Sequence, residues 1–470
     1  MTTSIKEFLL NHGAKGPVSF HMPGHKGSAI YKETGHADFL EAAMDCDITE
    51  ITGADNLFQP EGIIRKSMNR YKTIYGSEES YLLVNGSSGG LIASILATVE
   101  KGGKLVMARN CHKSVFNALG LGNIQPVYAY PETVEEYGIL GAVSAEEIAR
   151  CLDENPDASA VILPSPNYYG ICSDVKSIAE EVHKRGKVLI IDQAHGAHLK
   201  GFESFGYDDM PLPAESQGAD LVINSIHKTL ASFTQTALLN VCSSRVDRFL
   251  IEDKLQTIES SSPSYLMMAS LDINADILEK HGERLFKEWH ENIEYFYNEA
   301  AEIKGLHVMK DKNLDFTKLN LDMSQLGIDG NKLEELLMEK GIFVELVTGN
   351  ILMCMTGIGN KRCDFERLIA ALKGISESHE LQETAVEPPQ ALTKKLEMGR
   401  IPERKCFVGI WEAEGRVCAS SIIPYPPGIP IVCPGEVIDK DVIEYISRMR
   451  ALGGKVIGIS GDGKIAVSLE

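Results

Sequence analysis

Asp220-Leu-Val-Ile-Asn-Ser-Ile-His-Lys-Thr-Leu230 is the most informative stretch of this sequence. Its apolar half predicts a buried β-strand, and Ser225, His227 and Lys228 follow directly where that strand ends. In an open α/β sheet, the ligand crevice lies just outside the carboxyl ends of the strands. A lone lysine at a strand end is more often an ordinary exposed residue. The surrounding segments therefore decide whether this lysine is a routine surface residue or a reactive one.

Strand-length apolar runs alternate with helical segments on both sides of this stretch. The predicted strands span residues 81–84, 104–108, 126–130, 158–163, 187–191, 220–223 and 236–241. Amphipathic segments such as 144–153 and 177–185 lie between them and predict helices. This alternation is typical of a mainly parallel sheet that is covered by helices on both faces. We therefore expect an α/β fold for this part of the chain.

The rest of the chain divides around that block. A length of 470 residues predicts about three units at roughly 150 residues each. We expect an N-terminal arm at 1–75, a large α/β domain at 76–270 and a small α+β domain at 271–375. A C-terminal α/β appendage is expected at 395–470. Residues 376–394 are polar and acidic, which predicts a linker.

The composition excludes several classes of partner. The chain has 46 Lys and Arg against 66 Asp and Glu, a formal net charge of −20. That balance argues against nucleic acid and against an anionic membrane surface as partners. No apolar run is long enough to span a membrane. The ten cysteines form no CxxC pair, which favours reduced thiols and a cytoplasmic location.

Three further segments place reactive residue types at predicted strand ends. Gly86, Ser87 and Ser88 open an apolar helix, where free backbone N–H groups and hydroxyls suit a phosphate. Asp192 ends a buried strand, where a carboxylate needs a cationic partner. His112 follows another strand, and its flat ring is suited to stacking on an aromatic ring. Taken singly, a Gly/Ser loop is usually only a turn, and a lone histidine is usually a capping or packing residue.

Together with Lys228, these segments predict a site for pyridoxal 5′-phosphate. A lysine forms a Schiff base with this cofactor, an aspartate pairs with its pyridine nitrogen, and a Gly/Ser cup binds its phosphate. We expect no metal site. His21 and His25 have the spacing of a helical zinc pair, but Pro23 and Gly24 between them forbid that helix.

Longer motifs make the chain resemble the bacterial ornithine/lysine/arginine decarboxylases of the aspartate-aminotransferase fold, in their short form. The resemblance runs nearly end to end, and its first and last motifs are more specific than a general cofactor signature. The matching segments are His21-Met-Pro-Gly-His-Lys-Gly27, residues 47–57 with 60–62, residues 85–89, residues 111–114, residues 192–195, residues 225–228, and Tyr425-Pro-Pro-Gly-Ile-Pro430 with Pro434-Gly-Glu436.

The resemblance implies a fold type I large domain and a role for each matching residue. Lys228 would be the Schiff-base lysine, Asp192 would pair with the pyridine nitrogen, and His112 would stack on the ring. Glu436 would hold the distal cation of a basic amino acid. Ser260 and Ser261 would reach the neighbouring subunit's site in a homodimer or an assembly of dimers. The residues that would contact the cofactor are Gly86, Ser87, Ser88, His112, Asp192, Ala194, Ser225, His227 and Lys228.

The implied activity is decarboxylation of a basic L-amino acid to its amine. Either Lys228 or His112 would return the proton to Cα. We favour arginine as the substrate, with lysine and ornithine as alternatives. An aminotransferase of the same fold would need an arginine in the small domain for the substrate's α-carboxylate, and Arg362 and Arg367 are predicted to face solvent on a helix. A non-catalytic regulatory homologue is the remaining alternative.

Overall fold

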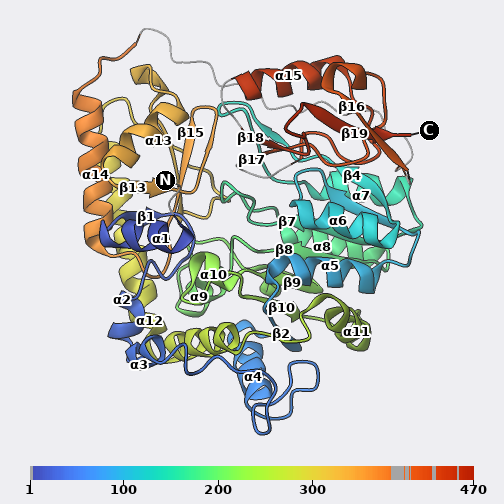
Figure 1. The fold of residues 1–470 in the computed structure, drawn as a ribbon, viewed down its shortest axis with the longest axis horizontal. Helices are drawn as coiled ribbons and strands as arrows, with labels where there is room; N and C mark the ends of the chain where they lie inside the picture. Colours follow the sequence, from blue (N-terminus) through green and yellow to red (C-terminus); the bar gives the residue numbers. More distant parts are fainter. Residues whose placement is uncertain are drawn as a thin grey trace.

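The structure, a computed structural model, describes residues 4–382, 396, 402, 404–425, 430–451 and 455–469. A large sheet with its helices fills one side of the molecule, and a smaller sheet packed against long helices fills the other (Figure 1). The C-terminal unit lies over the large-sheet side, near strand β4 (Figure 1). None of the helices in the described ranges is long and apolar enough to cross a membrane.

The large sheet has seven strands in the order β2-β10-β9-β8-β7-β3-β4. Strand β10 pairs antiparallel with both of its neighbours, and the remaining pairs are parallel. All seven predicted strands are confirmed to within two residues. Their bounds are β2 Glu79–Leu83, β3 Lys104–Ala108, β4 Gln125–Ala129, β7 Ala158–Pro164, β8 Val188–Asp192, β9 Leu221–Asn224 and β10 Ala237–Val241. A small hairpin, β5 Thr133–Val134 with β6 Ile139–Leu140, lies between β4 and the helix that follows.

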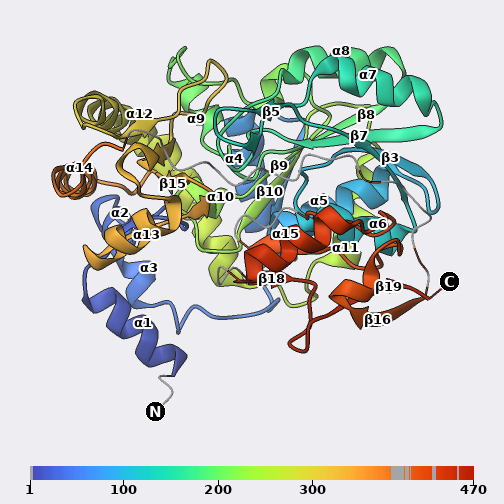
Figure 2. The same cartoon turned by 90° about the horizontal axis from the view of Figure 1, so that it is seen from above.

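Helices cover both faces of this sheet, as the alternating pattern predicts. Helices α5 (Gly86–Thr98) and α6 (Lys113–Gly122) lie on one side, and α7 (Ala145–Glu154) and α8 (Val175–Lys184) lie on the other (Figure 2). Helix α11 (Arg248–Ile258) packs against α5. Because both faces are covered, the strands are continuous apolar runs, and the side chains of β9 and β10 are buried throughout.

The second sheet has the order β11-β12-β15-β14. It combines β11 His307–Val308, β12 Lys318–Asp322, β14 Leu346–Thr348 and β15 Ile351–Met355 with helices α13 Gly330–Glu339 and α14 Arg362–Glu377. The 37-residue helix α12, Tyr265–Ala301, connects the two sheets and starts six residues before the predicted boundary at 271. Helix α14 continues two residues into the predicted linker, and residues 383–394 of that linker lie outside the described residues.

The N-terminal arm consists of short elements that pack against both sheets. Its strand β1 (Val18–Phe20) pairs in parallel with β13 (Ile342–Val344) of the smaller sheet's side. Tyr71 and Tyr75 of the arm donate hydrogen bonds to the carbonyls of Leu271 and Ala197. Its helices are α1 Ile5–Ala14, α2 Ala29–Glu33, α3 Ala37–Glu41 and α4 Ile63–Tyr75.

The C-terminal unit has its own small apolar core. Strand β16 (Lys405–Gly409) pairs antiparallel with β19 (Lys464–Ser468), and β17 (Ile423–Tyr425) pairs antiparallel with β18 (Lys455–Ile457). Helix α15 (Lys440–Ala451) lies between β17 and β18 in the sequence. The side chain of Cys433, a residue of this unit, is buried in the core of the large sheet. The C-terminal unit therefore contributes one side chain to the core of the large sheet.

Candidate active site

The reactive residues predicted at different strand ends meet at one edge of the large sheet. Asp192 is the last residue of β8, and Lys228 lies in the short helix α10 (Ile226–Thr229) after β9. His112 caps helix α6 after β3, and Ser87 lies in the first turn of α5. These four residues line one pocket together with Asn110, Pro164, Pro166, Asn167, Tyr168, Ala194 and His195.

Lys228 and Asp192 both line this pocket, and each charge acts on the pKa of the other group. Burial lowers the pKa of the Lys228 ammonium, while the Asp192 and Glu345 carboxylates act in the opposite direction. Burial raises the pKa of Asp192, against the effects of Lys228 and of the Ala194 N–H, which donates to Asp192 Oδ1 at 3.1 Å. Asp192 is only 6% exposed. Asp192 is therefore a buried acid whose ionised form would be stabilised by a further cation in the pocket.

His112 is held in one orientation by its own helix. Its Nδ1 lies 2.9 Å from the Ser114 hydroxyl and accepts a hydrogen bond from the Ser114 backbone N–H at 3.3 Å. Burial, together with the charges of Lys228 and Lys113, lowers the pKa of His112 to about 3. The imidazole is therefore neutral at physiological pH and presents an uncharged ring to the pocket.

The Gly/Ser cup lies where helix α5 begins. Gly86 has φ +76°, a left-handed conformation that glycine adopts without strain. Asn85 provides no side-chain cap, so the first backbone N–H groups of α5 are not used by it. The Ser225 hydroxyl donates to Ser87 Oγ at 2.8 Å and joins the cup to the segment of Lys228. Ser88 follows in the same turn and is half-buried.

His227 lies on the same segment as Lys228. Its Nδ1–H donates to the carbonyl oxygen of Thr236 at 2.8 Å, which fixes the ring. Burial lowers the pKa of His227 to about 4. The ring is therefore neutral at physiological pH, and it is not among the residues that line the Lys228 pocket.

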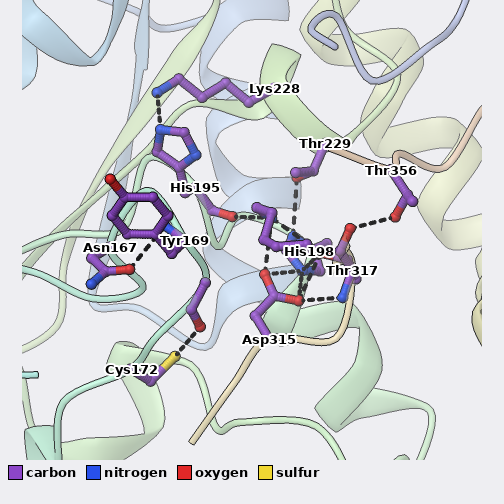
Figure 3. A network of polar contacts seen from close by, with 12 residues as sticks. Asn167, Tyr169, Cys172, His195, His198, Lys228, Thr229, Asp315, Thr317 and Thr356 are labelled. Atoms are coloured by element: carbon purple, nitrogen blue, oxygen red, sulfur yellow. Dashed lines mark hydrogen bonds and ion pairs between the residues drawn. The ribbon is translucent and has the colours of Figure 1, made fainter. Parts of the chain in front are cut away.

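His195 makes the closest side-chain contact to the lysine. Its Nε2 lies 2.9 Å from Lys228 Nζ (Figure 3). The pKa of His195 is far below its usual range because of burial and the nearby cations Lys228 and Lys318, so the ring stays neutral and its Nε2 accepts a hydrogen bond from Lys228 Nζ. Tyr168 lies against His195, with ring centroids 4.6 Å apart. His195 lies in the matching segment 192–195 but receives no role from the resemblance, and Tyr168 lies in none of the matching segments.

Three predicted substrate residues lie away from this pocket. Ser260 and Ser261 are exposed on the loop between α11 and α12, and Ser260 Oγ accepts from the Ser262 N–H. Glu436 is fully buried, and its two carboxylate oxygens accept from Arg109 Nε and Nη2, each at 2.8 Å. Glu436 therefore binds Arg109 in this chain instead of lining the Lys228 pocket, and its contact with a substrate remains a prediction.

The pocket fits pyridoxal phosphate. Two buried polar atoms of its lining, Asn110 Oδ1 and His195 Nδ1, have no hydrogen-bond partner among the described residues. The buried acid Asp192 and the uncapped start of α5 suit a pyridine nitrogen and a phosphate, respectively. No group of three or more His, Cys, Asp or Glu with the geometry of a metal site occurs in the described part of the chain.

This sheet order, with a lysine, an aspartate and a Gly/Ser cup at the strand ends, defines the fold type I class of pyridoxal-phosphate-dependent enzymes. Within that class, the chain belongs to the Orn/Lys/Arg decarboxylase family. The major domain of that family matches residues 3–321, and its C-terminal domain matches residues 375–462. The resemblance deduced from the motifs is thereby confirmed.

Individual relatives match over almost the full chain. An arginine decarboxylase of Bacillus subtilis is 30% identical over 97% of this chain and 95% of its own length. An arginine decarboxylase of Halalkalibacterium halodurans is 30% identical over 98% and 96%, respectively. Among solved structures, the constitutive lysine decarboxylase of E. coli superposes with a TM-score of 0.74 at 19% identity, covering 99% of this chain and 82% of that one.

Proposed function

We propose that this decarboxylase uses pyridoxal phosphate to convert L-arginine to agmatine and carbon dioxide. The observation that carries the proposal is the meeting of Lys228, Asp192 and His112 in one pocket of a chain that belongs to this family. When bound, the cofactor supplies the sink for the electron pair of the breaking Cα–carboxylate bond.

The chain's own residues would hold that cofactor as the sequence predicts. Asp192 would pair with the pyridine nitrogen, since its buried carboxyl needs a cationic partner. His112 would stack on one face of the ring, and Ala194 would pack against the other. The N-terminus of α5 would bind the phosphate, with side-chain contributions from Ser87, Ser88, Ser225 and His227.

Lys228 is the residue best suited to carry protons in this pocket. Its lowered pKa brings the amino group closer to losing its proton near neutral pH, which suits a nucleophile and a proton carrier. His112 is a poor proton donor there, because its pKa is about 3. Of the two candidates for returning a proton to Cα, we therefore choose Lys228, with His195 as the neutral acceptor that holds its Nζ.

Arginine is favoured by the relatives and is compatible with the charges near the pocket. The full-length relatives described above are arginine decarboxylases, whereas the lysine decarboxylase of Pseudomonas aeruginosa is only 22% identical. Glu345 adds a carboxylate close enough to raise the pKa of Lys228. The net charge of −20 is compatible with attraction of a cationic substrate.

An aminotransferase is less well supported. Arg362 lies over the ring of Tyr295 at 4.2 Å, and Arg367 points toward the carbonyl of Gly16 at 3.4 Å. Neither lines the Lys228 pocket. The α-carboxylate clamp that a transaminase needs is therefore not supplied by these two residues.

The working form that we propose is a cytoplasmic homodimer or an assembly of dimers. Ser260 and Ser261 are exposed on a loop that adjoins Glu259, and the Glu259 carboxylate accepts from the N–H groups of Val84 and Asn85 beside the cup. A second subunit that binds at this edge would bring the two serines close to its own site. The ten cysteines form no disulfide in the described structure, which suits a reducing compartment.

A product assay tests the activity. The purified full chain is given pyridoxal phosphate and, in parallel, arginine, lysine or ornithine, and carbon dioxide and amines are quantified. We expect agmatine from arginine and no product from a Lys228→Ala variant. Cadaverine or putrescine as the main product would change the substrate but keep the chemistry. Formation of keto acids, or full activity in Lys228→Ala, would refute the proposed reaction.

A further inference from the structure

A lysine of the smaller sheet contacts the backbone of His195, the residue whose side chain contacts Lys228. Lys318, the first residue of β12, is fully buried. Its Nζ donates to three oxygens: the carbonyl of His195 at 3.0 Å, Asp315 Oδ2 at 2.9 Å and Thr317 Oγ1 at 3.0 Å. An ammonium has three N–H donors, so every one of them is used.

The charge of Lys318 is balanced inside the same cluster. Burial by itself would raise the pKa of Asp315, but His198 and Lys318 hold it well below its usual range, so the carboxylate is ionised. Thr317 donates to Asp315 Oδ1 through its backbone N–H at 3.0 Å and its hydroxyl at 2.7 Å. His198 Nε2 lies 3.1 Å from Asp315 Oδ2.

Stability alone does not account for this buried pair. Apolar side chains of similar volume commonly stabilise a protein as well as a buried ion pair does, or better. An apolar residue at position 318 would leave the His195 carbonyl without its donor. The Lys318 ammonium, in contrast, holds the His195 carbonyl in one orientation by a hydrogen bond.

The residue that Lys318 holds by its backbone is the one that contacts Lys228 by its side chain. His195 lies in the tight turn between β8 and α9 (Leu199–Ser204), where the Gly196 N–H donates to the carbonyl of Gln193. A Cβ on Gly196 would meet Pro166 at 2.5 Å, so the turn has no room to shift on that side. Lys318 holds the same turn through its hydrogen bond to the His195 carbonyl.

We propose that Lys318 is a positioning residue of the active site, which acts through the His195 carbonyl to hold the His195 imidazole against Lys228. The proposal rests on the proposed function in taking Lys228 as the reactive lysine. It makes the smaller sheet a part of the site, because strand β12 supplies the donor and the turn after β8 supplies the acceptor.

The electrostatic effect of Lys318 gives the proposal a second readout. The groups that act on the pKa of Lys228 are Asp192 and Glu345, which raise it, and Lys318, which lowers it together with burial. His195 and His112 remain neutral beside it. Removal of the Lys318 charge therefore moves the titration of Lys228 to higher pH.

The test compares Lys318→Met with Leu319→Ala in the full chain. Leu319 is the next residue of β12, is fully buried in the core of the smaller sheet and does not line the Lys228 pocket, so its truncation costs stability only. The two measurements are hydrogen exchange of segment 193–199 and the pH dependence of Lys228 acylation, quantified by mass spectrometry. Both are made without cofactor or substrate.

We expect Lys318→Met to speed exchange in segment 193–199 by roughly 10- to 100-fold, the loss of one charge-assisted hydrogen bond. The acylation midpoint of Lys228 should move to higher pH, and Leu319→Ala should change neither readout. Thr317→Val keeps the charge but removes one acceptor of Lys318, and should give a smaller rise in exchange. If Lys318→Met does not fold, hydrogen exchange of Thr317→Val tests the proposal in its place.

Unchanged exchange in Lys318→Met, or an equal rise in Leu319→Ala, would overturn the proposal. A failure of the proposed reaction would appear separately, as the absence of amine and carbon dioxide in the product assay. The two results are therefore distinguishable, since neither exchange nor acylation depends on decarboxylation.

Discussion

The ion pair between Arg109 and Glu436 joins the C-terminal unit to the segment that leads into the active site, and its contribution to stability can be measured. Arg109 directly follows β3 and lies three residues before His112. Its guanidinium donates to both carboxylate oxygens of Glu436, and also to the carbonyls of Pro430 at 2.7 Å and Ile431 at 3.0 Å. The perturbations are Glu436→Leu, Arg109→Met and the two combined.

The expected magnitudes follow from burial. Glu436 is 0% and Arg109 is 9% exposed, so loss of either partner leaves the other charge buried and uncompensated. Breaking such a pair costs about 3–5 kcal/mol. In the Arg109→Met background the Glu436 charge is itself the unpaired group, and its removal should restore stability. Glu436→Leu is therefore expected to destabilise the native chain and to stabilise the Arg109→Met chain.

Alkylation of Cys433 under native conditions measures the local opening. Its thiol is fully buried, and its backbone N–H donates to Glu436 Oε2 at 2.8 Å. A loss of about 3–5 kcal/mol raises labelling by roughly 100- to several-thousand-fold, at tenfold per 1.4 kcal/mol. Glu154→Gln, which breaks the exposed pair with Arg150, is the matched control and should change labelling by less than about fivefold. Additive effects of the two substitutions would refute the reasoning.

Three further outcomes are expected from the pKa shifts and contacts of the pocket. Asp192→Asn should lower kcat/KM by about 10- to 150-fold, because a charge-assisted contact is lost. The same substitution should raise the melting temperature of the cofactor-free protein above pH 5. The reason is that the pKa of Asp192 is raised in the folded state, so ionisation of this carboxyl opposes folding there. His112→Ala should weaken cofactor binding by about 0.5–1.5 kcal/mol of stacking, whereas His112→Phe should retain it, as measured by equilibrium titration. The free energy of unfolding should fall as pH drops from about 6.5 toward 4, because the folded state lowers the pKa of His112 to about 3 and that of His227 to about 4, so the unfolded chain binds protons more readily. Each histidine contributes at most about 1.4 kcal/mol per pH unit. Urea unfolding should show that the free energy of unfolding of His112→Phe depends less steeply on pH.

The large sheet could be predicted because its signals are local. Parallel strands buried on both faces are continuous apolar runs, and the predicted strands at 104–108 and 187–191 match β3 and β8 to within one residue. The pocket residues Ser87, His112, Asp192 and Lys228 each lie within a few residues of a strand end. The rule that strand ends meet at one crevice then brings them together without knowledge of the tertiary contacts.

The supports behind the pocket could not be predicted in this way. Lys318 lies 123 residues from His195, and Arg109 lies 327 residues from Glu436. Lys318 starts the sequence Lys-Leu-Asn-Leu-Asp, whose alternation is equally typical of an exposed strand residue. Glu436 after Pro-Gly has the pattern of a solvated turn. Only the packing of distant segments shows that both are buried and which group each one binds.

The two supports act on different walls of the pocket. Arg109 fixes the segment that leads into His112 and takes its partners from the C-terminal unit, while Lys318 fixes the turn of His195 from the smaller sheet. The two clusters share no hydrogen-bond partner among the described contacts. His195 contacts Lys228 on one side, and His112 lines the pocket from the other segment. The large sheet therefore supplies the reactive groups, and the other two units each hold one of the walls between which those groups must remain aligned.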